Sequence, residues 1–239
     1  SSFAAFLAPM EHTAARLHAI AQQARQYLAP APYQPFIMVC AHASLKTGED
    51  GPTHADPQAL QLLTGNFAGH TMITLTPWEA SEVWPLMAAA LRARPAVIAP
   101  FVTRPLEKVP DRAVLKLAPA SLAVKGVYPL RRVEGKGHGT IVLQGSGVTL
   151  AFMEGVLPSL DKEGIKLNLY YVSSAELFDL LPEKERRELY PEELAREAMG
   201  ITEFTLPTLY RWVTSEAGRA ATLHPFRGGH YLGSGQAFQ

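Results

Sequence analysis

Two patterns of apolar residues alternate along the chain. From Met10 to Tyr27 apolar side chains recur at three- and four-residue steps, which predicts an amphipathic helix. The apolar run Phe36–Cys40 is bounded by breakers and predicts a strand buried on both faces. The alternation then continues, and the next expected elements are a helix over 57–63, a strand over 71–75, a helix over 77–94 and a strand over 96–99.

The alternation of expected helices and strands is interrupted and then begins a second time. Residues 119–139 combine prolines, mixed charges and a glycine-rich run, which predicts a linker with little regular structure. The elements expected beyond it are a strand over 140–144, a helix over 149–163, a strand over 165–171 and a charged helix over 182–198. The whole pattern predicts an α/β protein with two domains, 1–118 and 140–239, each a mainly parallel sheet flanked by helices.

Composition excludes several classes of protein. The chain has 239 residues, of which 47% are hydrophobic and 18% charged, so it is not a disordered sequence. Its 22 basic residues balance its 22 acidic ones, so we expect neither nucleic acid nor a membrane among its partners. The single cysteine, Cys40, excludes an intramolecular disulfide. No apolar run approaches the roughly 18–20 residues that span a bilayer, and we expect a cytoplasmic protein.

The polar loop after the predicted strand 36–40 carries the most chemistry. It runs from His42 to His54 and includes Asp50 between two glycines. Because open α/β sheets bind ligands at the carboxyl ends of their strands, we expect both imidazoles and the carboxylate at one mouth. Imidazoles exchange protons near neutral pH, and Asp50 can bind a hydroxyl or orient a histidine. The alternative is a polar turn in which Asp50 or Thr53 caps backbone N–H groups.

This loop resembles a known family. Residues 48–54, Gly-Glu-Asp-Gly-Pro-Thr-His, resemble the signature of transketolases, and His42 falls at the family's histidine before it. The segment 2–7 resembles the family's Thr-Phe-x-x-Phe stretch. Weaker similarities to the opening of the family's C-terminal domain follow in the right order at 145–150, 164–166 and 173–179. The closing residues 200–239 depart from the family's usual ending, so nothing is carried over there.

The resemblance implies a reaction and an assembly. Transketolases use thiamine diphosphate and a divalent cation, Mg²⁺, to move a two-carbon ketol unit between sugar phosphates, a reaction of the pentose phosphate pathway. In the family the cofactor lies between a diphosphate-binding domain of one subunit and a pyrimidine-binding domain of another. The chain resembles an N-terminally incomplete pyrimidine-binding domain over 1–118, followed by the C-terminal domain. The implied partner is a diphosphate-binding domain or subunit, in a homodimer or a heteromeric assembly.

The resemblance also implies catalytic roles. His42, His54 and Asp50 would face the sugar. Asp50 would hold a substrate hydroxyl, while the imidazoles would bind hydroxyls or phosphate and assist proton transfer to the carbonyl oxygen.

Two further roles follow from the same resemblance. Phe3 and Phe6 would pack on the aminopyrimidine ring of the cofactor, since offset aromatic stacking is favourable; an ordinary core pair is the alternative. Pro9 stands where the family usually has a third aromatic ring. Arg104 follows the predicted strand 96–99 near the family's phosphate-binding arginine, and a guanidinium fork suits a terminal phosphate. Its register differs by about two residues, so a plain surface arginine is the alternative.

Two parts of the family's machinery do not match this sequence. The glutamate that activates the cofactor's pyrimidine would precede Ser1, and Glu11 lies in the wrong order to replace it. The diphosphate-binding motif that holds the metal is also missing. We therefore expect no metal ligand in this chain, and we expect the isolated chain to be inactive.

Two other functions stay open at this point. Deoxyxylulose-phosphate synthases, which also use thiamine diphosphate, share a similar Asp-Gly-Pro-Thr-His loop. A non-catalytic transketolase-like interaction module would explain Pro9 and the divergent ending.

Overall fold

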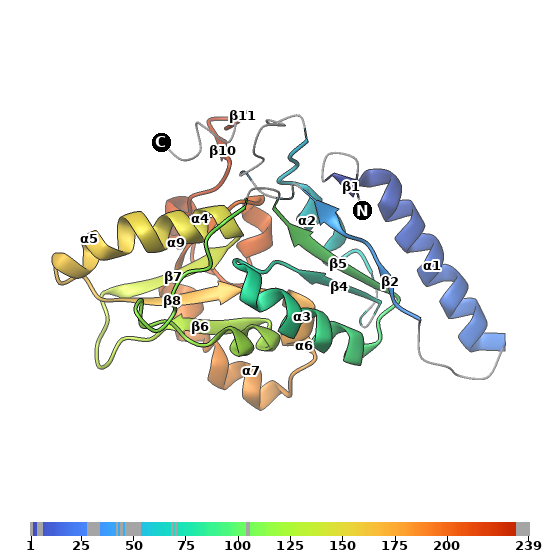
Figure 1. Ribbon diagram of the computed structural model, residues 1–239, viewed down its shortest axis with the longest axis horizontal. Coiled ribbons are helices and arrows are strands. Elements are labelled where there is room, and N and C mark those ends of the chain that lie inside the picture. The colour runs from blue at the N-terminus through green and yellow to red at the C-terminus, as the bar shows by residue number, and fades with distance from the viewer. Residues whose placement is uncertain are drawn as a thin grey trace.

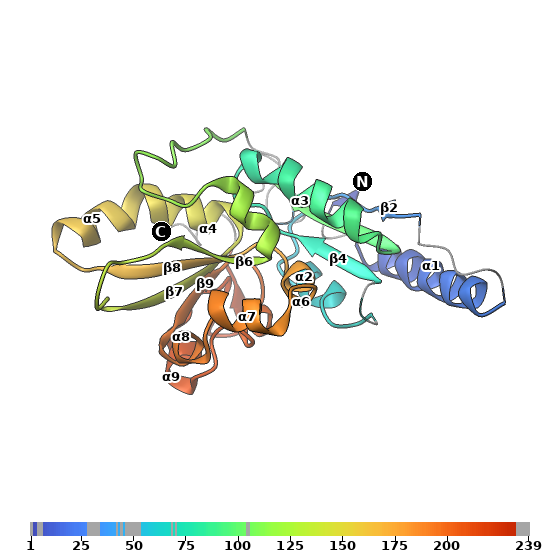
Figure 2. The same cartoon turned by 90° about the horizontal axis from the view of Figure 1, so that it is seen from below.

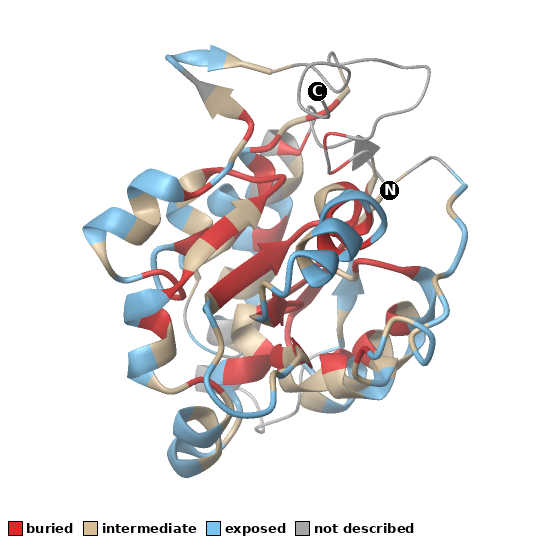
Figure 3. Cartoon of the chain, turned by 90° about the vertical axis from the view of Figure 1, so that its left-hand side faces the viewer, coloured by how far each residue is buried: buried red, intermediate tan, exposed pale blue. Residues whose placement is uncertain are grey.

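The computed structural model describes residues 2–3, 7–27, 34–41, 43, 45, 54–67, 69, 71–103 and 106–232. Two sheets lie side by side, the first at the right of Figure 1 and the second at the left. Both are flanked by helices, which confirms the predicted α/β class. Burial follows this layering, because the strands at the centre of Figure 3 are mostly buried while the helices expose their outer faces.

All strands of the first sheet are parallel. They are β1 (Ser2–Phe3), β2 (Phe36–Ile37), β3 (Cys40–Ala41), β4 (Met72–Leu75) and β5 (Val97–Val102). The sheet is built around β5, which pairs with β2, β3 and β4, while β1 pairs with β3. Parallel pairing of this kind fits strands that alternate with helices along the chain.

The predicted strand 36–40 differs from expectation. It forms two short strands instead of one, and the prediction that both faces are buried is wrong at its start. Phe36 and Ile37 are 36% and 43% exposed, whereas Met38 and Cys40 are buried. The reason is position in the sheet, because β2 lies at the end of the strand order and pairs only with β5.

Among the described residues, three helices accompany the first sheet: α1 (Ala8–Tyr27), α2 (Ala59–Leu63) and α3 (Ala80–Ala93). The predicted helices are therefore present with shifted ends. The α3 helix begins where the carboxylate of Glu79 accepts a hydrogen bond from the backbone N–H of Ser81, which satisfies one of the unpaired donors at a helix start.

The second sheet has the strand order β6-β8-β7-β9. Its strands are β6 (Val127–Arg131), β7 (Gly139–Gln144), β8 (Leu167–Val172) and β9 (Met199–Thr202). The β7–β8 and β7–β9 pairs are parallel, and β6 runs antiparallel to β8. The sheet is thus mainly parallel, as predicted, with one exception. That exception, together with the short 3₁₀ helix η3 (Ala120–Lys125), lies inside the stretch 119–139 that was expected to be a linker.

Helices cover both faces of the second sheet (Figure 2). One face carries α4 (Ser146–Ala151), the π-helical η4 (Phe152–Val156) and α5 (Leu157–Lys162), which follow one another without a break. The other carries α8 (Glu192–Glu197) and α9 (Glu216–Ala221). The remaining elements are α6 (Ala175–Asp179), α7 (Glu183–Leu189), η5 (Leu206–Leu209), β10 (Phe226–Arg227) and β11 (His230–Tyr231).

The expected single helix over 182–198 is wrong. It is divided into α7 and α8, because Pro191 lacks the backbone N–H that a continuous helix needs; Pro191 directly precedes α8. On α7 the side chains of Glu183 and Arg187, four residues apart, form an ion pair.

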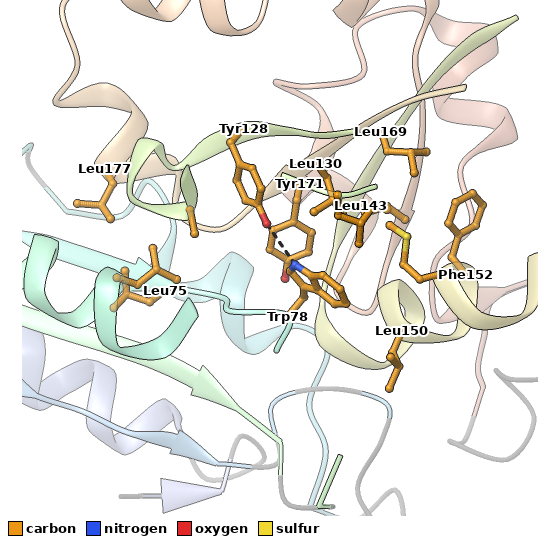
Figure 4. Close-up of a cluster of buried hydrophobic side chains, with 14 of the residues drawn as sticks. Leu75, Trp78, Tyr128, Leu130, Leu143, Leu150, Phe152, Leu169, Tyr171 and Leu177 are labelled. Carbon is orange, nitrogen blue, oxygen red and sulfur yellow. Dashed lines mark hydrogen bonds between the residues drawn. The ribbon is translucent and has the colours of Figure 1, made fainter. Parts of the chain in front are cut away.

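One hydrophobic core joins the two sheets. Leu75 and Trp78, from the end of the first sheet, pack with Tyr128, Leu143 and Tyr171 of the second (Figure 4). The Trp78 indole Nε1 donates to the Tyr128 hydroxyl at 3.1 Å, drawn as a dashed line in Figure 4. The Tyr171 hydroxyl donates to the carbonyl of Thr76 at 2.6 Å. Residues on both sides of the expected linker therefore share buried contacts.

No helix within the described ranges is both long enough and apolar enough to cross a membrane.

Candidate functional site

The register of the first sheet brings three strand ends together. Phe3 of β1 lies opposite Ala41 of β3, and Ala41 lies opposite Val102 of β5. All three strands run in the same direction, so their carboxyl ends meet at one edge. The chain leaves this edge toward His42 from β3 and toward Thr103 from β5. This is the edge at which the sequence predicts a ligand site.

Most of the predicted site residues lie outside the described residues. These are His42, Asp50, Arg104 and Phe6. The structure describes the backbone of Phe3 as part of β1 and shows His54 half-buried just before α2. That the loop side chains converge on one mouth therefore stays a prediction.

A cavity of about 290 Å³ occupies the described part of this region. Its wall includes Thr103 after β5, the Pro77–Glu79 turn after β4 and Ser146 after β7. The carboxyl ends of strands from both sheets therefore border one cavity, and the arrows of β5 and β8 in Figure 1 point toward this junction. Glu107 and Lys108 complete its polar lining. Hydroxyls, an ammonium and carboxylates are groups that can bind a hydroxylated or anionic ligand.

The hydroxyl of Ser146 is a distinctive part of this wall. Ser146 is 8% exposed, and its Oγ has no hydrogen-bond partner among the described residues. A buried hydroxyl without a partner is uncommon in folded proteins, because its desolvation is not compensated. Sequence reasoning missed Ser146 as a site residue, and its place between two glycines after a predicted strand is the signal that could have found it.

The start of α4 is already occupied by a carboxylate. Glu203 Oε1 accepts a hydrogen bond from the backbone N–H of Val148 at 3.0 Å. Gly145 precedes the helix with φ 109°, and a Cβ placed there would come within 2.6 Å of Glu203 Oε2. Gly145 is therefore required both by its backbone angle and by the close approach of Glu203. The Glu203 carboxylate serves here as the negative group that helix N-termini attract.

A buried ionic cluster holds the segment before β6 against α3. Arg112 Nη2 donates to Glu82 Oε1 at 2.6 Å, and Arg112 Nε donates to Glu79 Oε1 at 2.9 Å. The Tyr128 hydroxyl also donates to Glu82, and the Trp78 backbone N–H donates to Glu82 Oε2 at 3.2 Å. The guanidinium lies 4.9 Å from the centre of the Trp78 ring, a cation–π distance. Trp78 and Glu79 also line the cavity, so the cluster sets the position of its wall.

Burial dominates the ionisation of Glu82. Desolvation raises the pKa of Glu82 to about 7, although Arg112 and the hydrogen bonds from Tyr128, Arg112 and Trp78 lower it. The carboxyl therefore changes charge near neutral pH inside the junction of the two sheets.

Cys40 does not have the properties of a nucleophile. It is fully buried, and burial raises its pKa to about 12. A thiol in this state is inert, because the thiolate is the reactive form.

Within the described ranges, no group of three or more histidine, cysteine, aspartate or glutamate side chains could hold a metal ion.

Comparison with known proteins identifies similar chains. No protein-family model matches the sequence. The transketolase of Aquifex aeolicus is 32% identical over 160 residues, which are 67% of this chain and 22% of that protein. The transketolase of Rhodobacter capsulatus is 28% identical over 184 residues, which are 77% of this chain and 26% of that protein. Among solved structures, the transketolase from Leishmania mexicana superposes with a TM-score of 0.63 at 20% identity. That superposition covers 83% of this chain and 27% of that one. The chain thus spans about a quarter of the length of the curated relatives it matches.

Proposed function

We propose that this transketolase-like chain, which covers part of that family's length, is the portion of a transketolase that carries the substrate-facing loop. The enzyme it belongs to would transfer a two-carbon ketol unit between sugar phosphates. The relatives it matches are named transketolases, which does not favour the synthase alternative.

The single observation that carries the proposal is the strand register. Phe3, Ala41 and Val102 end side by side at one edge. In the sequence, the loop that carries the transketolase-like signature begins after Ala41 and ends at His54. A sugar phosphate bound there would meet the segments on which the resemblance places its binding groups. The hydroxyls and the ammonium around the neighbouring cavity suit such a polar, anionic ligand.

We assign roles to the chain's own residues accordingly. Asp50 accepts a hydrogen bond from a substrate hydroxyl, which orients the sugar. His42 and His54 donate to substrate oxygens and move a proton to or from the carbonyl oxygen, a task suited to imidazole side chains. Arg104 binds the terminal phosphate, since a guanidinium offers paired donors to phosphate oxygens.

The cofactor proposed is thiamine diphosphate with Mg²⁺. When bound it supplies a stabilised carbanion that accepts the ketol unit. Phe3 and Phe6 pack on its pyrimidine ring and exclude water from it. Because the family's diphosphate-binding motif does not match this sequence, we assign the diphosphate and the Mg²⁺ to a partner.

The proposed partner is a diphosphate-binding domain or subunit, in a homodimer or a heteromeric assembly. On the basis of the resemblance we further propose a cytoplasmic location and two domains, 1–118 and 140–239, with strand β6 from the stretch between them joining the sheet of the second.

A direct test is ketol transfer between pentose phosphates by the complete assembly, with thiamine diphosphate and Mg²⁺ supplied. His54→Ala should reduce the rate on the order of 10²-fold or more, the usual contribution of an acid–base group. The matched control is His230→Ala, an exposed histidine on β11, which should leave the rate unchanged. An assembly with no transfer activity, or an unaffected His54→Ala variant, would remove the proposal in favour of a non-catalytic module.

A further inference from the structure

A second cavity, of about 440 Å³, lies between the two halves of the chain. Residues around α2 form one side, including Gln61 and Phe67, and residues of α6 and the turn after η5 form the other. None of its lining residues belongs to the loop or strand ends assigned above. Pockets at the junction of two packed units are common ligand sites, because both units contribute walls.

Glu176 stands out among the groups on this wall. Its Oε2 accepts from the backbone N–H of Thr74 at 3.1 Å and from the Thr74 hydroxyl at 2.7 Å. The Ser174 hydroxyl donates to the same oxygen at 3.4 Å. Among the described residues, the side-chain donors to this carboxylate all reach Oε2 and none reaches Oε1, although the backbone N–H of Glu176 itself also bonds to this carboxylate.

The carboxylate of Glu176 also lacks a positive partner. No lysine, arginine or histidine of the described chain forms an ion pair with it. Burial raises the pKa of the Glu176 carboxyl above its ordinary value, although hydrogen bonds from Thr74, from the backbone N–H of Glu176 itself and from Ser174 lower it. A desolvated carboxylate without a cation is unfavourable in its charged form, so a ligand that brings a positive group gains from pairing with it.

The one cationic side chain on the wall is already committed. Arg211 Nη1 donates to Asp179 Oδ2 at 2.8 Å, and Nη2 donates to Oδ1 of the same carboxylate. The guanidinium also lies 4.7 Å from the centre of the Trp212 ring. Arg211 therefore neutralises Asp179 and is poorly placed to recruit an anion. Over the described lining residues, Glu176 and Asp179 carry one more negative charge than Arg211 balances, and Arg186, which does not line the cavity, also pairs with Asp179 at 3.4 Å.

We propose that this cavity binds a small organic cation, whose ammonium or amidinium group pairs with Glu176 and whose flat apolar body lies against Phe67. The cavity is far larger than a bare metal ion needs, and an aromatic ring favours an organic cation by cation–π attraction. Because Glu176 of α6 also holds Thr74 of β4, the ligand sits on a contact between the two sheets. Its binding should therefore stabilise the junction against unfolding.

The test uses the full chain and three probes: benzylamine, benzamidine and the uncharged benzyl alcohol. Binding is measured by calorimetry at about pH 8, where an ordinary carboxyl is ionised. Benzylamine and benzamidine should bind and raise the melting temperature, and benzyl alcohol should bind at least about tenfold more weakly. Failure of both cations to bind, or equal binding of the alcohol, would overturn the proposal.

Two variants locate the site. Glu176→Gln keeps an acceptor for Thr74 and should weaken benzylamine binding by about tenfold or more, whereas the exposed control Glu163→Gln should not change it. Leu180→Lys places an internal ammonium four residues after Glu176 on the same wall, and should abolish binding while the chain stays folded. Unchanged binding in either variant places the cation elsewhere and refutes the assignment. None of these readouts depends on ketol transfer, so they test the cavity separately from the proposed function.

Discussion

Tyr128 of β6 donates its hydroxyl proton to the carboxylate of Glu82 on α3, and both side chains are fully buried. This bond joins helix α3, which flanks the first sheet, to a strand of the second. Arg112 approaches the same carboxylate from the segment between them. A buried polar network of this kind is stabilising only while every member keeps its partners, so small changes to it have measurable effects.

Glu82→Gln should change how stability depends on pH. The folded-state pKa of Glu82, about 7, is above its usual value of 4.5, so the folded chain holds this proton more tightly than the unfolded chain. The contribution of Glu82 is therefore complete below about pH 4.5 and is lost as the pH rises to about 7. The glutamine variant lacks this loss. Its free energy of unfolding relative to wild type should rise by up to about 3 kcal/mol across that window.

Urea denaturation of both proteins between pH 4.5 and 8 measures this difference, in which the other titrating groups cancel. A difference that stays constant across the range would mean that Glu82 does not titrate near neutrality.

Tyr128→Phe should destabilise the fold by about 1–3 kcal/mol. The change removes a donor to Glu82 and leaves the Trp78 indole N–H without its buried acceptor. Tyr210→Phe is the matched control, because Tyr210 is 41% exposed, and it should cost less than about 0.5 kcal/mol. Chemical denaturation monitored by fluorescence compares the two. Equal effects would show that the buried network contributes nothing specific.

Gly145→Ala should destabilise the chain by more than about 2 kcal/mol, because the new Cβ would have to displace Glu203 and adopt a positive φ. Gly155→Ala is its counterpart within η4, where a Cβ meets nothing within 4 Å. That change should stabilise by up to about 1 kcal/mol, since alanine favours helix. Melting temperatures in opposite directions are expected, and a tolerated Gly145→Ala would contradict the Glu203 contact.

Cys40 should be unreactive in the folded chain. Because burial raises its pKa to about 12, neither thiolate nor access is available to a thiol reagent near pH 8. Titration with a chromogenic disulfide should therefore give no signal under native conditions and one thiol per chain in denaturant. Rapid labelling of the native chain would show that β3 opens readily.

Much of this protein's fold could be predicted from its sequence, because the spacing of apolar residues reflects which side chains of each helix or strand are buried. The helix α1, the strands β4, β5, β7 and β8 and their parallel arrangement follow from apolar spacing and from the alternation of elements. The segments that resemble transketolases also lie in the family's order, and the relatives confirm that likeness. That the loop from His42 to His54 forms a site stays a prediction.

Where the spacing of apolar residues gave a wrong prediction, the cause lies in the tertiary structure. The apolar residues Phe36 and Ile37 look like a buried strand, but they lie at the edge of a sheet, which local sequence does not reveal. Pro129 and its neighbours look like a linker, yet β6 gains its hydrogen bonds from β8, some forty residues later. Strand pairing depends on a distant partner, so its signal is absent from the segment itself.

Only the tertiary structure decided the junction between the sheets. Arg112 and Tyr128, which both donate to Glu82, lie 30 and 46 residues after it in the sequence. Glu203 accepts from the start of a helix 55 residues earlier. Glu176 accepts from Thr74, which lies 102 residues before it. Each of these side chains reads in the sequence as an ordinary surface charge or a core aromatic. Their roles arise because packing removes water from both partners at once, and desolvation is a property of the assembled core, which no stretch of sequence carries alone.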